Sequence, residues 1–125
     1  MVSIMNTLVT AVLSIVLSVM AQFALKAGMS SSDVREVMAQ PLALRTLFGV
    51  LTNKFVFGGF CLYGLGAIVW LGVLSKWDVS KAYPLVGLGF VLTVAIGLLL
   101  GEQVTIPRAV GVVLICIGVF LVSRS

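Results

Sequence analysis

The chain has 125 residues, of which 61% are hydrophobic and 10% are charged, and its formal net charge is +4. This composition excludes a water-soluble globular domain, and residues 1–125 suit a single domain of about four membrane spans, since each span needs roughly 20 apolar residues. Because histidine is absent and the two cysteines lie within apolar runs, we expect no enzymatic activity, no metal or cofactor and no nucleic acid partner.

The first span is predicted at about residues 4–25 and carries a polar residue at every fourth position. These residues are Asn6, Thr10, Ser14, Ser18, Gln22 and Lys26, and none of them is an acid. Residues four apart lie on one face of a helix, and a polar face is costly in lipid unless it meets protein or water. The pattern therefore predicts that this helix lines a substrate route or a helix interface.

The polar residues of the first span divide by expected role. Thr10 and Ser14 are interpreted as structural, because hydroxyl groups form hydrogen bonds within membrane helix bundles. Ser18 and Gln22 are candidates for binding sugar hydroxyls, although such residues also bond across helices. Lys26 is a candidate phosphate contact, with a membrane-boundary residue as the alternative. The segment lacks an early basic cluster and a small-residue cleavage site, so we expect it to be retained.

Residues 29–53 are too polar to span a bilayer. Asp33 and Glu36 have the spacing of a helix cap, and apolar residues alternate with Arg45, Thr46 and Asn53 after Pro41. These features predict an amphipathic helix that lies on the membrane surface. A longer, tilted second span that starts near Leu42 is the alternative.

The second and third spans are predicted at about residues 55–74 and 79–100. Five glycines in the second span suit close packing between helices. Lys76, Trp77 and Asp78 have the basic and aromatic character of a membrane interface. Because this turn is short, we expect the two spans to be antiparallel neighbours.

Lys81 and Tyr83 lie at the start of the third span. A helix N-terminus offers unpaired N–H groups and partial positive charge, so this region and Lys81 together suit an anionic group such as phosphate. Tyr83 adds a hydroxyl beside an apolar ring. The competing interpretation is that Lys81 only reaches the phosphates of surrounding lipids.

The fourth span is predicted at about residues 107–122. Glu102 and Arg108 flank the turn before it, and we expect them to pair and to hold this loop. Five cations flank the loops after the first and third spans, and three lie on the opposite side. This distribution leans towards a cytoplasmic first loop with both termini outside, and it leaves either orientation open.

Several short motifs resemble the small multidrug resistance and EamA-type members of the drug/metabolite transporter superfamily. The matching residues are Ala82-Tyr83-Pro84, Gly101-Glu102, Pro107-Arg108-Ala109-Val110-Gly111, Leu114-Ile115 and Gly118-Val119, with Leu17-Ser18-Val19, Gln22 and Lys26 in the first span. The resemblance covers roughly residues 79–123. It implies a four-helix subunit that works as a dimer, with dimer contacts through Gly111, Leu114, Ile115, Gly118 and Val119.

One departure from the multidrug exporters is informative. Those exporters use a glutamate in the first span to bind protons and cations in turn, and alignment on Lys26 puts Ser18 at its position. A serine cannot exchange a proton for a cation. With a serine at this position, the chain is similar to the branch that lacks the acid, the aminoarabinose-phosphoundecaprenol flippase subunits. This resemblance implies a bacterial inner membrane protein that acts on a lipid-linked sugar, as a homodimer or with a related small subunit.

Three functional hypotheses follow. The first is a flippase for a polyprenyl-phosphate-linked sugar or a similar anionic lipid, in which Lys26 and Lys81 hold phosphate while Ser18, Gln22 and Tyr83 meet polar groups. No acid lies in mid-span to carry a proton, so exchange or downhill flipping is the simpler hypothesis for its energy source. The second is an exporter of small cationic or zwitterionic compounds, which requires Asp78 or Glu102 as an anionic anchor. The third is a packing or regulatory subunit that transports nothing alone.

Overall fold

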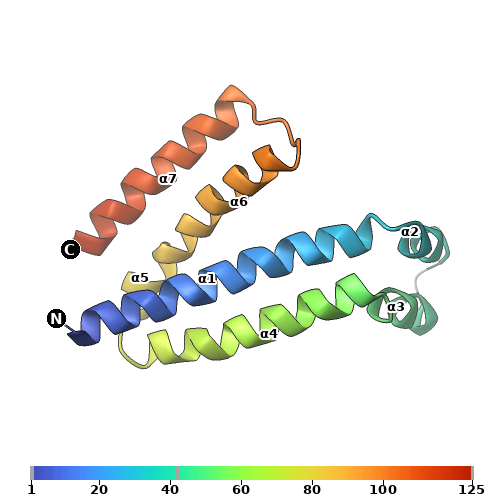
Figure 1. Cartoon of the computed structure of the whole chain (residues 1–125), viewed down its shortest axis with the longest axis horizontal. Helices are drawn as coiled ribbons and strands as arrows, with labels where there is room; N and C mark the ends of the chain where they lie inside the picture. The colour runs from blue at the N-terminus through green and yellow to red at the C-terminus, as the bar shows by residue number, and fades with distance from the viewer. Residues whose placement is uncertain (1, 42, 125) are drawn as a thin grey trace.

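The computed structural model describes residues 2–41 and 43–124, and every regular element in these ranges is helical (Figure 1). In chain order the elements are α1 (Val2–Met29), α2 (Ser32–Met38), α3 (Leu44–Leu51), α4 (Lys54–Leu74), α5 (Val79–Ala82), the 3-10 helix η1 (Tyr83–Gly87), α6 (Leu88–Leu99) and α7 (Ile106–Arg124). Within the same ranges, the segments long and apolar enough to cross a membrane are Met5–Met29, Lys54–Leu74, Val79–Leu99 and Ile106–Arg124. The expected fold class, an all-α membrane protein with four spans, is confirmed.

The helices run up and down, so the connections gather at two ends of the molecule (Figure 1). The start of α1, the end of α7 and the α4–α5 turn lie at one end, which we call the terminal side. The helices α2 and α3 and the turn between α6 and α7 lie towards the other end, which we call the loop side. Sites on the two sides are therefore separated by the membrane-spanning part of the bundle.

The helices α1 and α4 lie side by side and antiparallel (Figure 1). Glycines of α4 make this close approach possible. An ideal Cβ at Gly59 would lie 2.8 Å from Cδ2 of Leu25, and one at Gly66 would lie 3.3 Å from Cβ of Leu17. Because Gly59 and Gly66 are two helical turns apart, they present one narrow face to α1, as small residues do in membrane helix packing.

The third span is broken, whereas the sequence led us to expect one continuous helix. Pro84 has no N–H to donate, and the backbone tightens around it into η1 between α5 and α6. The third span contacts α7 through η1 and α1 through α6. A Cβ at Gly87 would lie 2.9 Å from Ile115 Cγ2 of α7, and a Cβ at Gly89 would lie 3.3 Å from Ile15 Cγ2 of α1.

The α6–α7 turn depends on a glycine in the left-handed region, Gly101, whose φ is +90°. The N–H of Gly101 donates to the Leu98 carbonyl at 3.2 Å, and the N–H of Glu102 donates to the Gly97 carbonyl at 2.8 Å. This pair of bonds is the Schellman arrangement that ends many helices. It reverses the chain and brings Glu102 back beside Gly97.

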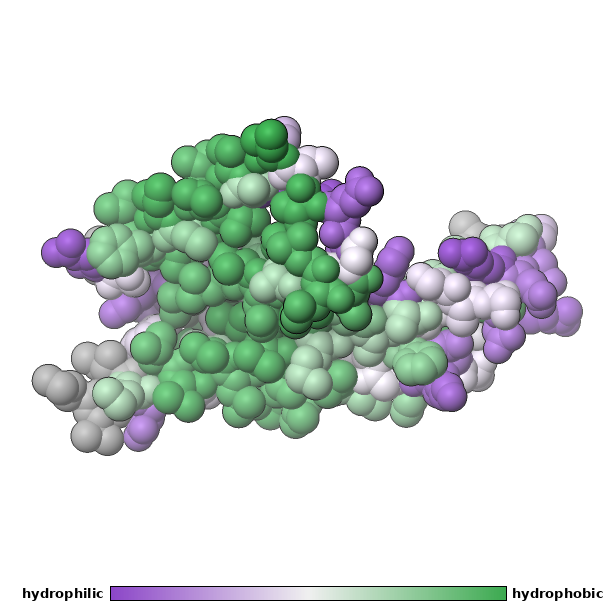
Figure 2. Space-filling model, turned by 45° about the horizontal axis from the view of Figure 1, so that its top comes forward, coloured by the Kyte–Doolittle hydropathy of each residue, from purple (hydrophilic) through white to green (hydrophobic). Residues whose placement is uncertain are grey.

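Two short helices, α2 and α3, replace the single amphipathic helix expected between the first two spans. The alternative of one longer second span is wrong, because Asn53 separates α3 from α4 and caps α4 by accepting from the N–H groups of Phe55 at 3.0 Å and Val56 at 3.2 Å. Leu42, near which that longer span was expected to start, lies outside the described residues. Hydrophilic residues gather at the end that carries α2 and α3, and the rest of the visible surface is mostly hydrophobic (Figure 2).

The helix α1 continues past the predicted end of the first span at about residue 25. Gly28 does not end the helix, which continues to Met29. Gly28 is buried, and a Cβ there would lie 2.8 Å from the Asn53 side-chain oxygen and 2.8 Å from the backbone nitrogen of Val56. The last turn of α1 therefore packs directly on the start of α4, which the missing side chain of Gly28 allows.

The buried core lies where the four spans meet around η1. It comprises Ala11, Ile15 and Val19 of α1, Val73 of α4, Ala82, Leu85 and Val119. Most other large apolar side chains are exposed on the outer faces of the spans. Such a surface is stable in hydrocarbon, which agrees with a multi-pass membrane protein.

The α1–α4 contact generates a stability prediction. Gly59→Ala places a methyl group against the side chain and the backbone nitrogen of Leu25, and overpacking of this kind costs about 1–3 kcal/mol. We expect a lower melting temperature for purified Gly59→Ala in detergent. The matched control is Gly58→Ala, because an added Cβ at Gly58 meets nothing within 4 Å. Equal melting temperatures for the two variants would contradict the observed helix contact.

Candidate functional site

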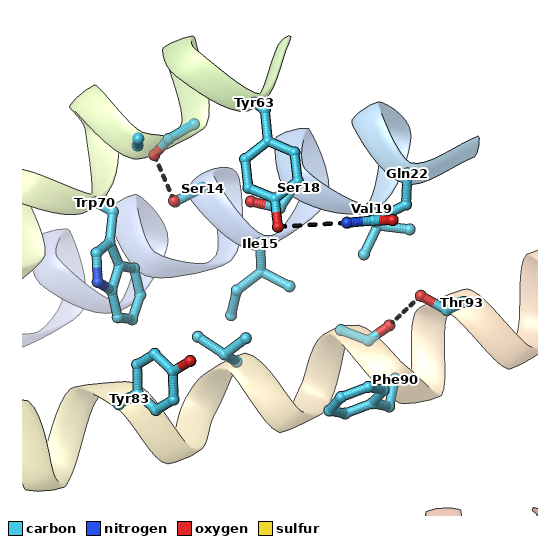
Figure 3. Close-up of a pocket in the computed structure, with 14 residues that line it drawn as sticks. Ser14, Ile15, Ser18, Val19, Gln22, Tyr63, Trp70, Tyr83, Phe90 and Thr93 are labelled. Carbon is cyan, nitrogen blue, oxygen red and sulfur yellow. Dashed lines mark hydrogen bonds between the residues drawn. The ribbon is translucent and has the colours of Figure 1, made fainter. Parts of the chain in front are cut away.

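A cavity of about 610 Å³ lies between the α1–α4 pair and the segment that runs from η1 into α6 (Figure 3). Its lining residues come from these four elements, and none of them is charged. They are Ser14, Ile15, Ser18, Val19, Gln22, Tyr63, Gly66, Ala67, Trp70, Tyr83, Val86, Gly89, Phe90 and Thr93. An apolar wall with a few placed polar groups is typical of a site for an organic ligand.

The polar face of α1 carries side chains that are hydrogen-bonded within the protein and a hydroxyl that is not. Thr10 donates from Oγ1 to the Asn6 carbonyl within its own helix at 2.8 Å. Ser14 is buried and donates from Oγ to the Gly66 carbonyl of α4 at 2.7 Å. In contrast, the Ser18 hydroxyl lines the cavity and has no hydrogen bond to another residue in the described part of the chain. Ser18 can therefore bond to a ligand without losing an internal partner.

Gln22 and Tyr63 form a polar pair on one wall of the cavity (Figure 3). The Nε2 of Gln22 donates to the Tyr63 hydroxyl oxygen at 3.3 Å. The tyrosine proton and the Gln22 amide oxygen stay available, because each side chain has further hydrogen-bonding capacity. This pair offers a donor and an acceptor to a polyhydroxylated group.

Tyr83 and Thr93 line the opposite wall, on η1 and α6 (Figure 3). Thr93 donates from Oγ1 to the Gly89 carbonyl at 2.7 Å, so its oxygen can still accept. Tyr83 is 65% exposed, and its ring lies across the cavity from Trp70 in the close-up view. The break of the third span at Pro84 positions Tyr83 at the cavity.

Among the lining side chains that carry a polar group, Tyr63, Trp70 and Thr93 were not predicted from the sequence. Tyr63, Gly66 and Trp70 are spaced by three and four residues, so they share one face of α4. Thr93 is a single hydroxyl residue within the apolar run of α6. The spacing on α4 and the isolated hydroxyl on α6 are both visible in the sequence. Only the packing of these helices against α1 shows that the side chains face a cavity.

The two lysines expected at the site lie outside this cavity and at opposite ends of the bundle. Lys26 is exposed in the last turn of α1, on the loop side. Lys81 follows α4 on the terminal side, with its Nζ 5.0 Å from the ring centroid of Trp77. The helix α4, which runs from the loop side to the terminal side, has 21 residues and is about 30 Å long at 1.5 Å per residue. One phosphate group therefore does not reach both lysines at once in this conformation, and the contacts of Lys26 and Lys81 with phosphate stay a prediction.

The residues expected to form dimer contacts also separate into two groups. Ile115 and Val119 pack within the subunit, because a Cβ at Gly87 would lie 2.9 Å and 3.2 Å from their Cγ2 atoms. Leu114 is 63% exposed, and an added Cβ at Gly111 or Gly118 meets nothing within 4 Å. Dimer contacts through α7 stay a prediction, and only this second group is open to a partner.

A second cavity of about 480 Å³ lies between α6 and α7 and shares Phe90 and Thr93 with the first. It is lined by Phe90, Thr93, Val94, Glu102, Val104, Pro107, Arg108, Gly111, Val112 and Ile115. The expected pairing of Glu102 with Arg108 is wrong. Arg108 donates from Nη1 to the Gln103 carbonyl at 2.9 Å, and the described residues hold no ion pair between the two side chains.

Known proteins similar to this chain are small membrane flippase subunits. The probable 4-amino-4-deoxy-L-arabinose-phosphoundecaprenol flippase subunit ArnF of Proteus mirabilis is 30% identical over 119 residues, which cover 92% of this chain and 90% of the relative. The corresponding probable subunit ArnE of Pseudomonas savastanoi is 45% identical over 80 residues, covering 63% of this chain and 70% of the relative. No family model and no solved structure matches the chain.

The Ser14 hydrogen bond gives a second stability prediction. Ser14→Ala leaves the Gly66 carbonyl without its side-chain donor, and interhelical bonds of this kind contribute about 0.6 kcal/mol on average and up to about 1.7 kcal/mol. We expect the free energy of unfolding in detergent to fall by an amount in this range. Ser18→Ala is the matched control and is expected to unfold like the wild type. A larger loss for Ser18→Ala than for Ser14→Ala would contradict the assignment.

Proposed function

Because the chain belongs to the family of small aminoarabinose-phosphoundecaprenol flippase subunits, we propose that it moves a polyprenyl-phosphate-linked sugar across the bacterial inner membrane. The observation that supports this most directly is the cavity between α1, α4, η1 and α6. It carries hydroxyl and amide groups and no charge, inside the part of the bundle that spans the membrane. This chemistry suits the hydroxyl groups of a sugar.

The polar groups of the cavity lower the cost of taking a sugar through hydrocarbon. A buried hydroxyl without a hydrogen-bond partner costs about 1–3 kcal/mol, and a sugar carries several. In the proposal, Ser18, Gln22 and Tyr83 replace the water around these hydroxyls, together with Tyr63 and Thr93. The rings of Trp70 and Tyr83 provide apolar surface for the faces of the sugar ring.

The cavity is open at its edge, which suits a substrate with a long lipid tail. Gln22, Tyr63, Tyr83 and Phe90 line it and are all exposed. The outer faces of the spans are apolar, so a polyprenyl chain can stay in the bilayer while the head group enters the bundle (Figure 2). Extraction of the tail into water, which would cost about 0.8 kcal/mol per CH₂ group, is avoided.

The two lysines suit successive contacts with phosphate. In the proposal, Lys81 holds the phosphate on the terminal side and Lys26 holds it on the loop side, with the cavity between them. A cation at each surface attracts the anionic head group where it enters or leaves. The separation of the lysines then reflects the distance that the phosphate must travel.

The working unit in this proposal contains two subunits. The relatives are themselves named subunits, and the outward side of α7 exposes Leu114 with open space beside Gly111 and Gly118. Small residues on an outer face allow two helices to approach closely. We propose a related small subunit as the partner, with a second copy of this chain as the other arrangement to be tested.

The competing hypothesis of a small-cation exporter has less support. Such an exporter needs an acid where its substrate binds, and the cavity in the middle of the bundle has none. The hypothesis of a subunit that transports nothing alone predicts no activity for this chain by itself. It is tested by comparing liposomes that contain the chain alone with liposomes that also contain a related subunit.

A transport assay tests the proposed function. Proteoliposomes carry a polyprenyl-phosphate-linked amino sugar, and the measurement is the rate at which its amine becomes reachable by a membrane-impermeant reagent. We expect Gln22→Ala and Tyr83→Phe each to slow this rate about tenfold, because each removes a hydrogen bond to the sugar worth about 1–1.5 kcal/mol. Gln40→Ala, which changes a glutamine outside both cavities, is expected to leave the rate unchanged.

The same assay identifies the alternatives. Rates in the two cavity variants equal to that of the wild type would contradict the assignment of the cavity. A wild-type protein that moves a small organic cation, but not the lipid, would support the exporter hypothesis instead.

A further inference from the structure

We propose that Glu102 binds the ammonium group of the sugar on the loop side of the bundle and selects amino sugars over neutral sugars. This inference rests on the proposed function and adds a determinant of specificity to it. It concerns the second cavity, between α6 and α7. That cavity shares the lining residues Phe90 and Thr93 with the first, so the two cavities are neighbours.

The backbone places the Glu102 carboxylate against α6. The turn at Gly101 returns the chain, and the N–H of Glu102 donates to the Gly97 carbonyl. The side chain then lies over Gly97, where an ideal Cβ would be 2.6 Å from Oε2. Any side chain at position 97 would displace the carboxylate. Gly97 therefore keeps the acid along the edge of the bundle, where it lines the cavity.

The carboxylate has no internal cation to neutralise it. Arg108 lines the same cavity, but its Nη1 donates to the Gln103 carbonyl. Within residues 2–41 and 43–124, the Glu102 side chain makes no hydrogen bond and no ion pair. Of the four acids in the chain, Glu102 alone lines either cavity, since Asp33 and Glu36 lie on α2 and Asp78 lies in the α4–α5 turn. The group is available to an external cation.

The chemistry of an amino sugar supplies that cation. The names of the relatives specify a 4-amino-4-deoxy sugar on a phosphate. A primary amine is protonated near neutral pH, so such a head group carries a positive charge on the sugar and a negative charge on the phosphate. Lysines alone can recognise only the phosphate. A carboxylate is needed to recognise the ammonium, through a charge-assisted hydrogen bond.

The position of Glu102 makes this recognition one-sided. The acid lies in the loop-side turn and lines a cavity, whereas Asp78, the acid of the terminal-side turn, lines neither of the two cavities. A head group that meets Glu102 has its amine on the loop side. Selection for the amino group therefore takes place at one membrane surface only.

A comparison of two substrates tests this inference. Proteoliposomes carry either the amino-sugar lipid or the same lipid with its amine acetylated, which removes the charge, and a fluorescence-quenching readout on the sugar follows both. For Glu102→Gln we expect the rate for the amino lipid to fall about tenfold and the rate for the acetylated lipid to stay at the wild-type value. Glu36→Gln is the matched control on the same side and is expected to change neither rate.

A second variant tests the position of the carboxylate without changing any charge. Gly97→Ala inserts a methyl group whose three nearest neighbours are all atoms of Glu102. It is expected to reproduce the selective loss seen with Glu102→Gln. Glu102→Asp, which keeps the charge on a shorter side chain, is expected to retain part of the preference.

The outcomes separate this inference from the proposed function. Equal losses for both lipids in Glu102→Gln would mean that the residue only maintains the turn, and unchanged rates would mean that it has no role; either result overturns the inference. A wild-type protein that moves neither lipid would overturn the proposed function itself.

Discussion

Hydrocarbon offers no hydrogen bonds, so every polar group in the spans must find its partner within the protein or in the substrate. The polar face of α1 meets this constraint in two ways. Ser14 bonds to a carbonyl of α4, which it reaches because Gly66 lets the two backbones approach. Ser18 and Gln22, further along the same face, line a cavity. One face of α1 therefore both packs against the glycines of α4 and supplies polar side chains to the cavity.

The broken third span completes this arrangement. Because Pro84 interrupts α-helical bonding, η1 brings Tyr83 to the cavity. In the same segment, the missing side chain of Gly87 leaves room for side chains of α7 to pack. The result is an uncharged binding region in the middle of the bundle with charged groups only at its two ends. A lipid with a polar, charged head and a long apolar tail fits such a distribution, because the head moves between charged surfaces through polar contacts and the tail never leaves the bilayer.

Sequence reasoning succeeded where a one-dimensional pattern has a direct spatial meaning. The four-residue spacing of Ser14, Ser18 and Gln22 defines a helix face in any context, and long apolar runs define spans. It failed where the answer depends on how helices pair. The sequence did not show that Ile115 and Val119, two residues of the expected dimer motif, also pack on Gly87 within the subunit. Tyr63, Trp70 and Thr93 became site residues only once α4 and α6 were placed against α1.

The central claim is that this bundle binds a polyprenyl-phosphate-linked sugar, with its phosphate near one lysine or the other. Native mass spectrometry tests it most directly, on protein purified gently from cells that synthesise a polyprenyl-phosphate-linked amino sugar. We expect this lipid to stay bound to the wild type and its occupancy to fall in Lys26→Ala and in Lys81→Ala. Bulk phospholipid alone, in equal amounts on the wild type and both variants, would contradict it.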